Sequence, residues 1–323
     1  MSLASLRERL TGCYVTVPTQ FCDDDDLSLN LPAIERHVAY LLEGGLREGN
    51  AVLLAGGAAG DFSTMSFEER LRVAETVVRA ADGRVPVAMG AQTASTRELV
   101  ALTRAADQLG ADFIQVSPPF YFSHTEEDFF EYVSAAAAAA PRVGIIVYNT
   151  YWTSVGVSRG LVERLLELPN FVGLKWATPD HGFMEYEGVV ARYSEQVSII
   201  DNQCRFVTSH ILGARCIELH ICNHWPQWGA RLWELLESRR YREAQLAMAD
   251  VLMPFLELWG EMEQFTSGDG YLDKLCMELV GLDSSRCRPP TRDVRSVFRA
   301  RARHMLRACG TPGVVAGDGA VDE

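Results

Sequence analysis

The chain has 323 residues, of which 30 are basic and 43 acidic, so its formal net charge is −13 at pH 7. This acidity argues against a nucleic-acid groove or an anionic membrane surface as partner, because both need a basic face. The content of 48% hydrophobic and 23% charged residues is typical of a folded globular protein.

Two further features of the sequence bear on its location. No apolar run approaches the roughly 20 residues of a membrane span, and the first ten residues lack the apolar core of a signal peptide. Eight cysteines are scattered along the chain without a CxxC pair, which indicates reduced thiols. We therefore expect a cytoplasmic protein with neither a nucleic-acid nor a membrane partner.

Short β-rich runs alternate with longer helical patterns over the first two thirds of the chain. The runs are rich in Val and Ile, as parallel strands covered on both faces are. They predict strands at 13–17, 51–54, 85–89, 112–116, 143–148, 171–176, 197–201 and 216–221. Helices are predicted between them at 31–46, 66–81, 95–109, 125–139, 158–168, 181–193 and 205–212. Ser66, Ser95 and Thr125 are predicted helix caps, and Glu69 completes a capping box with Ser66.

Eight strands with intervening helices predict a (β/α)8 TIM barrel. A doubly wound open sheet is the competitor, but it usually has about six strands, and no GxGxxG motif follows the first strand. Beyond about residue 225 the strand pattern stops, and helices are predicted at 231–240, 243–263, 271–282 and 292–308. The predicted organisation is a barrel over 1–240, a C-terminal helical extension over 241–309 and a disordered tail over 310–323.

The active site of such a barrel lies at the carboxyl ends of its strands, so the residues that end each strand are the candidates. The second predicted strand leads into a glycine-rich turn, in which Gly57 and Gly60 flank Ala58 and Ala59. Glycines let the backbone approach an anion and point amides at it, although a tight strand-to-helix turn needs the same residues. The turn is therefore a candidate binding site for a carboxylate.

Lys175 lies near the end of the sixth predicted strand, among apolar residues. Desolvation lowers the pKa of an ammonium group, and a neutral amine is a nucleophile toward ketones. The alternative is a lysine that extends from the strand end to solvent. Tyr148 ends the adjacent strand, and a phenol can relay the protons that imine formation requires.

These segments resemble the dihydrodipicolinate synthase/N-acetylneuraminate lyase family of class I aldolases. The resemblance covers roughly 10–305 and is carried by GGAAGDFSTMSFEER (56–70), RVPVAMG (84–90), ADFIQVSPPFYF (111–122), VYN (147–149), GLKWAT (173–178) and RPP (288–290). It implies that Lys175 forms a Schiff base with a 2-oxo acid and that Tyr148 is the proton shuttle. It further implies that Tyr121 acts across a subunit boundary in a homodimer or homotetramer. The protonated imine is itself an electron sink, so no cofactor is expected.

Departures from the family pattern bear on the substrate. Ala58 and Ala59 stand where the family usually has Thr or Ser hydroxyls for the substrate carboxylate, and Asp61 replaces a Glu. No arginine follows the Tyr-Asn pair until Arg159, and Trp176 follows the lysine where the family often has Glu. A dicarboxylic amino-aldehyde acceptor is therefore not expected, and Trp176 is a candidate contact for a flat acceptor.

The last two predicted strands carry unusual polar residues. Glu218 and His220 alternate with apolar residues and so share one face, and the seventh strand ends at Asp201, where the family is glycine-rich. We expect Glu218 and Asp201 to add negative charge to the substrate pocket. The alternative is that Glu218 and His220 point outward and pair with Arg215 or Arg205. The HxCxH spacing that begins at His220 lacks the features of a zinc site, so no metal is expected.

The predicted function is a class I aldolase or lyase. Lys175 would form a Schiff base with pyruvate or a larger 2-oxo acid, and a carbon–carbon bond would be made or broken with a polar or aromatic aldehyde-type acceptor. Two alternatives stay open: a Schiff-base dehydratase or hydratase-aldolase, and a ligand-binding relative that has lost turnover. Because the turn lacks hydroxyls, weak affinity for simple pyruvate is expected.

Overall fold

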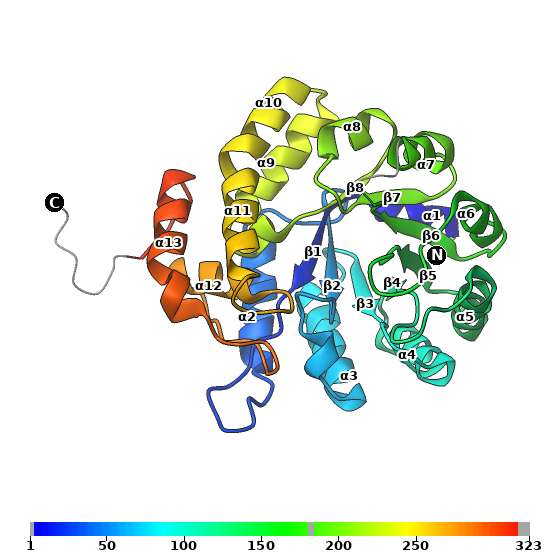
Figure 1. The fold of residues 1–323 in the computed structure, drawn as a ribbon, viewed down its shortest axis with the longest axis horizontal. Helices are drawn as coiled ribbons and strands as arrows, with labels where there is room; N and C mark the ends of the chain where they lie inside the picture. Colours follow the sequence, from blue (N-terminus) through cyan, green and yellow to red (C-terminus); the bar gives the residue numbers. More distant parts are fainter. Residues whose placement is uncertain (1–2, 180–183, 316–323) are drawn as a thin grey trace.

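Eight parallel strands form a closed barrel within residues 3–179 and 184–315, the part of the chain that the computed structural model describes (Figure 1). Each strand pairs with its sequence neighbours, and the first closes the barrel against the last. The strands are β1 (Gly12–Val17), β2 (Ala51–Ala55), β3 (Val87–Gly90), β4 (Phe113–Val116), β5 (Gly144–Tyr148), β6 (Phe171–Trp176), β7 (Ser198–Asp201) and β8 (Cys216–Glu218). The predicted (β/α)8 barrel is confirmed.

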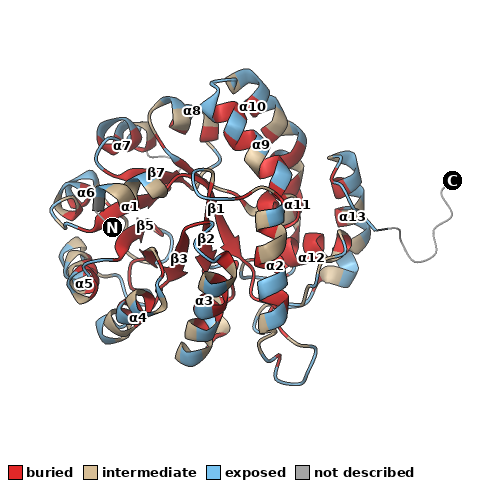
Figure 2. Ribbon diagram, turned by 180° about the vertical axis from the view of Figure 1, so that it is seen from behind, coloured by how far each residue is buried: buried red, intermediate tan, exposed pale blue. Residues whose placement is uncertain are grey.

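Helices cover the outside of the barrel, and Figure 2 shows their buried faces turned toward the strands. They are α2 (Leu31–Glu43), α3 (Phe67–Ala81), α4 (Thr96–Leu109), α5 (Glu126–Ala139), α6 (Arg159–Leu165), α7 (Glu185–Tyr193), α8 (Phe206–Ile211) and α9 (Pro226–Glu237). The side chains of Ser66, Ser95 and Thr125 accept hydrogen bonds from the first turns of α3, α4 and α5, as predicted for helix caps. The helix predicted over 181–193 corresponds to α7, which begins at Glu185; residues 181–183 lie outside the described part of the chain.

The amino-terminal end of the barrel is closed by a helix that the sequence patterns did not predict. Helix α1 (Leu3–Arg9) precedes the first strand, and Leu6 and Leu10 join the inward-facing core together with Tyr14 and Phe113. Because apolar side chains fill this end, the open end of the barrel is the opposite one, where the strands finish. The 3-10 turns η1 (Phe62–Thr64) and η2 (His220–Asn223) lie at that carboxyl end.

Further helices follow the barrel and lie along one side of it. They are α10 (Tyr241–Ala247), the π-helical segment η3 (Met248–Leu252), α11 (Met253–Met262), α12 (Tyr271–Leu279) and α13 (Arg295–Ala308), which lies outermost in Figure 1. The single helix predicted over 243–263 is thus interrupted. Pro254 explains this, because its ring would clash with the carbonyl four residues back, and the wider π turn, in which Met253 N–H bonds Met248 O, relieves the clash.

Several element ends differ from the predictions; α9, for example, begins five residues before the helix predicted from 231. Strand β8 finishes at Glu218, three residues earlier than predicted, because η2 begins at His220. After α13, residues 310–315 form turns and irregular backbone, and the rest of the predicted tail, 316–323, lies outside the described residues. No helix in the described part of the chain is both long and apolar enough to cross a membrane.

Candidate active site

A cavity of about 490 Å³ opens at the carboxyl end of the barrel. Its floor is formed by side chains from the strand ends, including Lys175, Tyr148 and Glu218, and one wall comes from the C-terminal helices through Leu252 and Trp259. Another hollow, of about 360 Å³, lies around Arg7 and Arg215 at the opposite end of the barrel and contains none of the predicted site residues. The cavity at the carboxyl end is therefore the candidate active site.

Lys175 lies on the inner face of β6, directly beside Tyr148 of β5 in the strand register. Its residue is 4% exposed, and its Nζ lies 4.4 Å from the centre of the Tyr148 ring and 3.8 Å from Glu218 Oε1. Burial lowers the pKa of the Lys175 ammonium, and the carboxylates of Glu218 and Asp269 oppose this effect. The lysine is enclosed rather than extended to solvent, so its amine has the environment of a nucleophile.

The Tyr148 hydroxyl accepts a hydrogen bond from Asn202 Nδ2 at 3.0 Å. Burial, reinforced by the charge of Glu218, raises the pKa of Tyr148 far above its usual value. The phenol therefore stays protonated at neutral pH and can donate a proton to an oxygen bound in the cavity.

A second buried tyrosine, Tyr14 of β1, lies beneath the lysine. Its hydroxyl bonds Gln115 Oε1 at 3.1 Å, and its ring centre is 5.4 Å from Lys175 Nζ. The sequence patterns did not predict Tyr14, Gln115 or Asn202 as site residues. Side chains alternate between the two faces of a strand, so counting every second residue along β1 and β4 would have identified Tyr14 and Gln115 as inward-facing.

Glu218 lies on the inner face of β8, opposite Tyr14 in the strand register, and lines the cavity. Its Oε2 is 3.3 Å from His220 Nε2, so the two polar side chains share the inner side of the barrel. The arginines of the outward alternative bond elsewhere: Arg215 to Glu237 and Arg205 to Glu187. The expectation that Glu218 adds charge to the pocket fits this arrangement.

The cavity is acidic apart from two side chains. Glu218, Glu263 and Asp269 line it, and within the described residues Lys175 and His220 are the only basic side chains that do so. Burial raises the pKa of Asp269 to about 6, although the charge of His220 opposes this rise. A ligand with a second negative charge would thus meet no free cation here.

The glycine-rich turn after β2 lies at the edge of the cavity. Gly57 needs to be glycine, because a Cβ there would lie 2.5 Å from the Leu54 side chain. The amides of Gly60 and Asp61 donate within the turn, whereas the described structure gives the amides of Ala58 and Ala59 no backbone acceptor. The Ala58 side chain lines the cavity. Ala59 is buried instead and its backbone packs against Gly270, so only one of the two alanines presents its side chain to a ligand.

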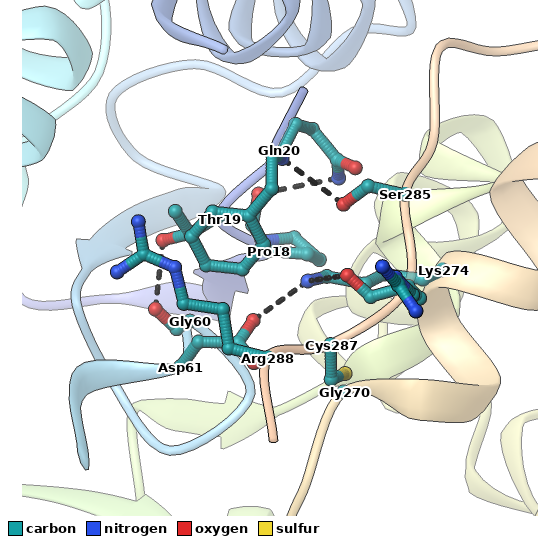
Figure 3. Close-up of polar contacts among 12 residues, drawn as sticks. Pro18, Thr19, Gln20, Gly60, Asp61, Gly270, Lys274, Ser285, Cys287 and Arg288 are labelled. Atoms are coloured by element: carbon teal, nitrogen blue, oxygen red, sulfur yellow. Dashed lines mark hydrogen bonds and ion pairs between the residues drawn. The ribbon is translucent and has the colours of Figure 1, made fainter. Parts of the chain in front are cut away.

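The turn is held from outside the barrel by an ion pair that the sequence analysis did not predict (Figure 3). Lys274 Nζ of α12 lies 2.7 Å from Asp61 Oδ2, and the two side chains are 0% and 4% exposed. The Thr19 hydroxyl adds a hydrogen bond to the Gly60 carbonyl at 2.7 Å. Burial raises the pKa of Asp61, and the nearby Lys274 charge opposes that rise. The C-terminal extension therefore fixes the position of the candidate carboxylate-binding turn.

Two predicted binding residues lie outside the cavity. Trp176 and Asp201 face each other in the register of β6 and β7 and point away from the barrel interior. Trp176 is enclosed in the apolar layer between strands and helices, and Asp201 accepts hydrogen bonds from the Ser209 hydroxyl and the Gln203 amide. The prediction that they contact substrate is wrong, because side chains alternate along a strand and Lys175 already takes the inward position.

Tyr121 does not line the cavity of its own chain. It is 87% exposed, has a φ of 87°, and stacks edge-on against Phe122 with 4.8 Å between ring centres. Its proposed role across a subunit boundary stays a prediction.

The imidazoles of the HxCxH segment, His220 and His224, stack on the Phe255 ring, and no cluster of three potential metal ligands occurs in the described chain.

Residues 9–309 match the Dihydrodipicolinate synthetase family, which covers nearly the whole chain and all of the site. The chain belongs to this family. It is 30% identical to the 4-hydroxy-tetrahydrodipicolinate synthase of Thioalkalivibrio sulfidiphilus, over 84% of this chain and 90% of that protein. It is 29% identical to the synthase of the same name from Marinobacter nauticus, over 93% of this chain and 99% of that protein. A shorter match, to the Laribacter hongkongensis synthase, reaches 34% identity over 57% of that protein.

Solved structures of this family share the fold. The dihydrodipicolinate synthase of Acinetobacter baumannii complexed with pyruvate superposes with a TM-score of 0.80 at 24% identity, covering 94% of this chain and 99% of that one. CdNal from Clostridium difficile in complex with mannosamine gives 0.78 at 19% identity, over 92% and 98%. The predicted dihydrodipicolinate synthase/N-acetylneuraminate lyase resemblance is confirmed. As a member of the Dihydrodipicolinate synthetase family, the chain is a lyase of the aldolase/synthase kind.

Proposed function

We propose that this family member is a class I aldolase in which Lys175 forms a Schiff base with a 2-oxo acid. The observation that carries the proposal is the position of Lys175. Its amine is buried at the floor of a cavity, its pKa is lowered, and its Nζ lies 4.4 Å from the ring centre of the protonated Tyr148. The neutral amine attacks the keto carbon, Tyr148 donates a proton to the departing oxygen, and water leaves as the imine forms. The imine then accepts electrons from the neighbouring carbon, so the reaction needs no organic cofactor.

The substrate carboxylate would lie against the turn formed by residues 57–60. The amides of Ala58 and Ala59 are its donors, and the hydroxyls that the family usually adds are missing. A hydrogen bond to a charged group contributes about 1.5–3 kcal/mol. Losing one should weaken the binding of simple pyruvate by roughly tenfold or more.

The acceptor should differ from that of the relatives named 4-hydroxy-tetrahydrodipicolinate synthase, whose product carries two carboxylates. Glu218, Glu263 and Asp269 line the cavity, and no arginine does so among the described residues. Trp152 and Trp259 supply flat apolar surface on the same walls. One of those two carboxylates comes from the 2-oxo acid, so these features favour a hydroxylated, cationic or aromatic aldehyde over an aldehyde that carries a carboxylate of its own.

A Schiff-base dehydratase or hydratase-aldolase is the second candidate. The observation that favours it is the pair of Glu218 and His220 beside Lys175, because elimination of water from an imine needs a base and an acid within reach.

Borohydride reduction in the presence of 2-oxo acids tests the proposal. We expect a stable mass increment on Lys175 with pyruvate or a larger 2-oxo acid, located by peptide mapping. Lys274, the only other lysine of the chain, is the internal control, because it is buried in an ion pair and should stay unmodified. An adduct on Lys274, or none with any 2-oxo acid, would refute the assignment. Trapping without aldol cleavage or condensation would refute the aldolase reaction.

A further inference from the structure

A row of charged side chains leads away from the Schiff-base lysine toward the C-terminal helices. Lys175 Nζ is 3.8 Å from Glu218 Oε1, and Glu218 Oε2 is 3.3 Å from His220 Nε2. The other imidazole nitrogen, His220 Nδ1, is 3.0 Å from Asp273 Oδ2. Three elements supply these groups: β8 ends with Glu218, η2 begins with His220, and α12 carries Asp273.

The far end of the row is rigid. Asp273 is fully buried, and its Oδ1 accepts a second hydrogen bond from Asn223 Nδ2 at 2.9 Å. The His220 ring packs against Phe255, stacked at 6.2 Å between ring centres, and against Trp259, edge-on at 4.7 Å, and these two rings contact each other at 5.8 Å. Carboxylates beside both nitrogens and this aromatic packing hold the imidazole that Glu218 meets in position.

Charge also fixes the protonation of this histidine. Burial alone would lower the pKa of His220, but the carboxylates of Asp273 and Glu218 raise it to about 10. At neutral pH the imidazolium therefore donates the N–H of Nδ1 to Asp273, and its Nε2 side forms an ion pair with Glu218 at 3.3 Å. The titratable groups that interact with the charge of Glu218 are Lys175 from β6, Tyr148 from β5, Tyr14 from β1, Cys204 from the segment before α8, His220 and Cys222 from η2, and Asp269 from the segment before α12.

Tyr148 is a poor candidate for the base of the reaction. Its pKa lies far above the usual value, and its hydroxyl oxygen already accepts a hydrogen bond from Asn202. A phenol in this state gives protons but does not take one from carbon near neutral pH. Glu218 differs, because it is a carboxylate next to the lysine that would carry the imine. A pair of groups with such different environments divides the acid and base roles.

We propose that Glu218 is the general base that removes the C3 proton of the Lys175-bound imine, and that His220 and Asp273 hold it in position for this step. The inference rests on the proposed function and adds a catalytic residue to it. The C3–H bond breaks, its electron pair forms the C2–C3 double bond, and the C2–nitrogen double bond becomes a neutral enamine nitrogen. The proton passes to Glu218 and, after the enamine attacks an aldehyde, is available for the new alkoxide oxygen. Glu218 contacts the reacting group, whereas His220 and Asp273 are positioning residues.

Exchange of the C3 protons of pyruvate for deuterium, followed by proton NMR in D2O, isolates this step from the unknown acceptor. We expect the wild-type chain to exchange them and Glu218→Gln to lower the exchange rate by roughly 10²–10⁴-fold. Borohydride should still trap the imine on Lys175 in that variant. Glu218→Asp keeps a carboxylate and should recover part of the rate. Glu237→Gln, a matched change in an outer His–Glu contact of 2.9 Å with His210, should exchange like wild type.

The positioning role has its own readout. His220→Gln removes the ion pair that holds Glu218 in position, so the maximal exchange rate should fall while the pyruvate concentration that gives half-maximal exchange stays unchanged. Asp273→Asn should change the exchange in the same way as His220→Gln. If Asp273→Asn prevents folding because it is buried, His220→Gln alone tests the positioning role. Trapping at Lys175 with unchanged exchange in Glu218→Gln would overturn the inference and leave the proposed function intact. Loss of trapping in the wild-type chain would instead defeat the proposed function.

Discussion

The ion pair between Lys274 and Asp61 gives the sharpest prediction about stability. Both side chains are at most 4% exposed, and their atoms lie 2.7 Å apart. Lys274→Met would remove the ammonium and leave a carboxylate without its partner inside the protein. Breaking a buried pair in this way costs about 3–5 kcal/mol, because the remaining charge is neither solvated nor neutralised. The midpoint of urea unfolding, followed by circular dichroism, should fall accordingly.

A double variant separates the charge effect from simple loss of packing. Asp61→Asn combined with Lys274→Met removes both charges, so it should recover most of the stability that Lys274→Met loses. Arg142→Met is the matched control. Arg142 forms an ion pair of similar length with Asp107, at 2.8 Å, but its side chain is 81% exposed. The unfolding midpoint of Arg142→Met should stay unchanged. A Lys274→Met protein as stable as wild type, or a double variant less stable than Lys274→Met, would refute the reasoning.

Three further predictions follow from the site and the surface. Tyr148→Phe should lower turnover by roughly 10²–10⁴-fold in steady-state assays while leaving the fold intact, and unchanged turnover would contradict its role as the acid. His220 has a folded pKa of about 10 against an ordinary 6.5, so its stabilisation is complete below about pH 6.5 and is lost as pH rises through about 10. Urea unfolding should therefore lose stability over that interval, and His220→Gln should flatten the profile. Light scattering should give a homodimer or homotetramer, with Tyr121→Ala shifting it toward monomer; a wild-type monomer, as in one solved synthase variant, would contradict this.

The barrel could be predicted because its signals are local. Each strand is a short apolar run, and helix caps such as Ser66 and Thr125 use neighbouring residues. Helix α1 was missed, because its seven residues carry little periodic signal and its burial depends on the distant barrel interior. The break at η3 depends on Pro254, whose effect inside an otherwise helical pattern is a kink or a bulge according to the packing around it.

The candidate active site could likewise be predicted only in part. Lys175 and Tyr148 could be predicted, because Tyr148 ends its strand, Lys175 is one residue from the end of its own, and the two strands are neighbours. Trp176 and Asp201 were assigned to the pocket although each lies at an outward position of its strand. Asp269, Asp273 and Lys274 could not be placed, because their contacts depend on how helices after the barrel fold back over it. The sequence separation of 213 residues between Asp61 and Lys274 contains no local signal of their contact.

Two buried contacts with α12, from Asp61 to Lys274 and from His220 to Asp273, affect when the chain becomes active during its synthesis. Lys175 emerges 99 residues before Lys274, an interval of about 5–20 s at ordinary translation rates. Until α12 is added, the turn at Asp61 lacks its lysine and His220 lacks Asp273. A ribosome-bound barrel would thus carry an incomplete pocket, in which Lys175 is less shielded from water and burial lowers its pKa less. We expect nascent chains that end before residue 269 to resist borohydride trapping by 2-oxo acids, so that the reactive amine matures only when the last helices dock.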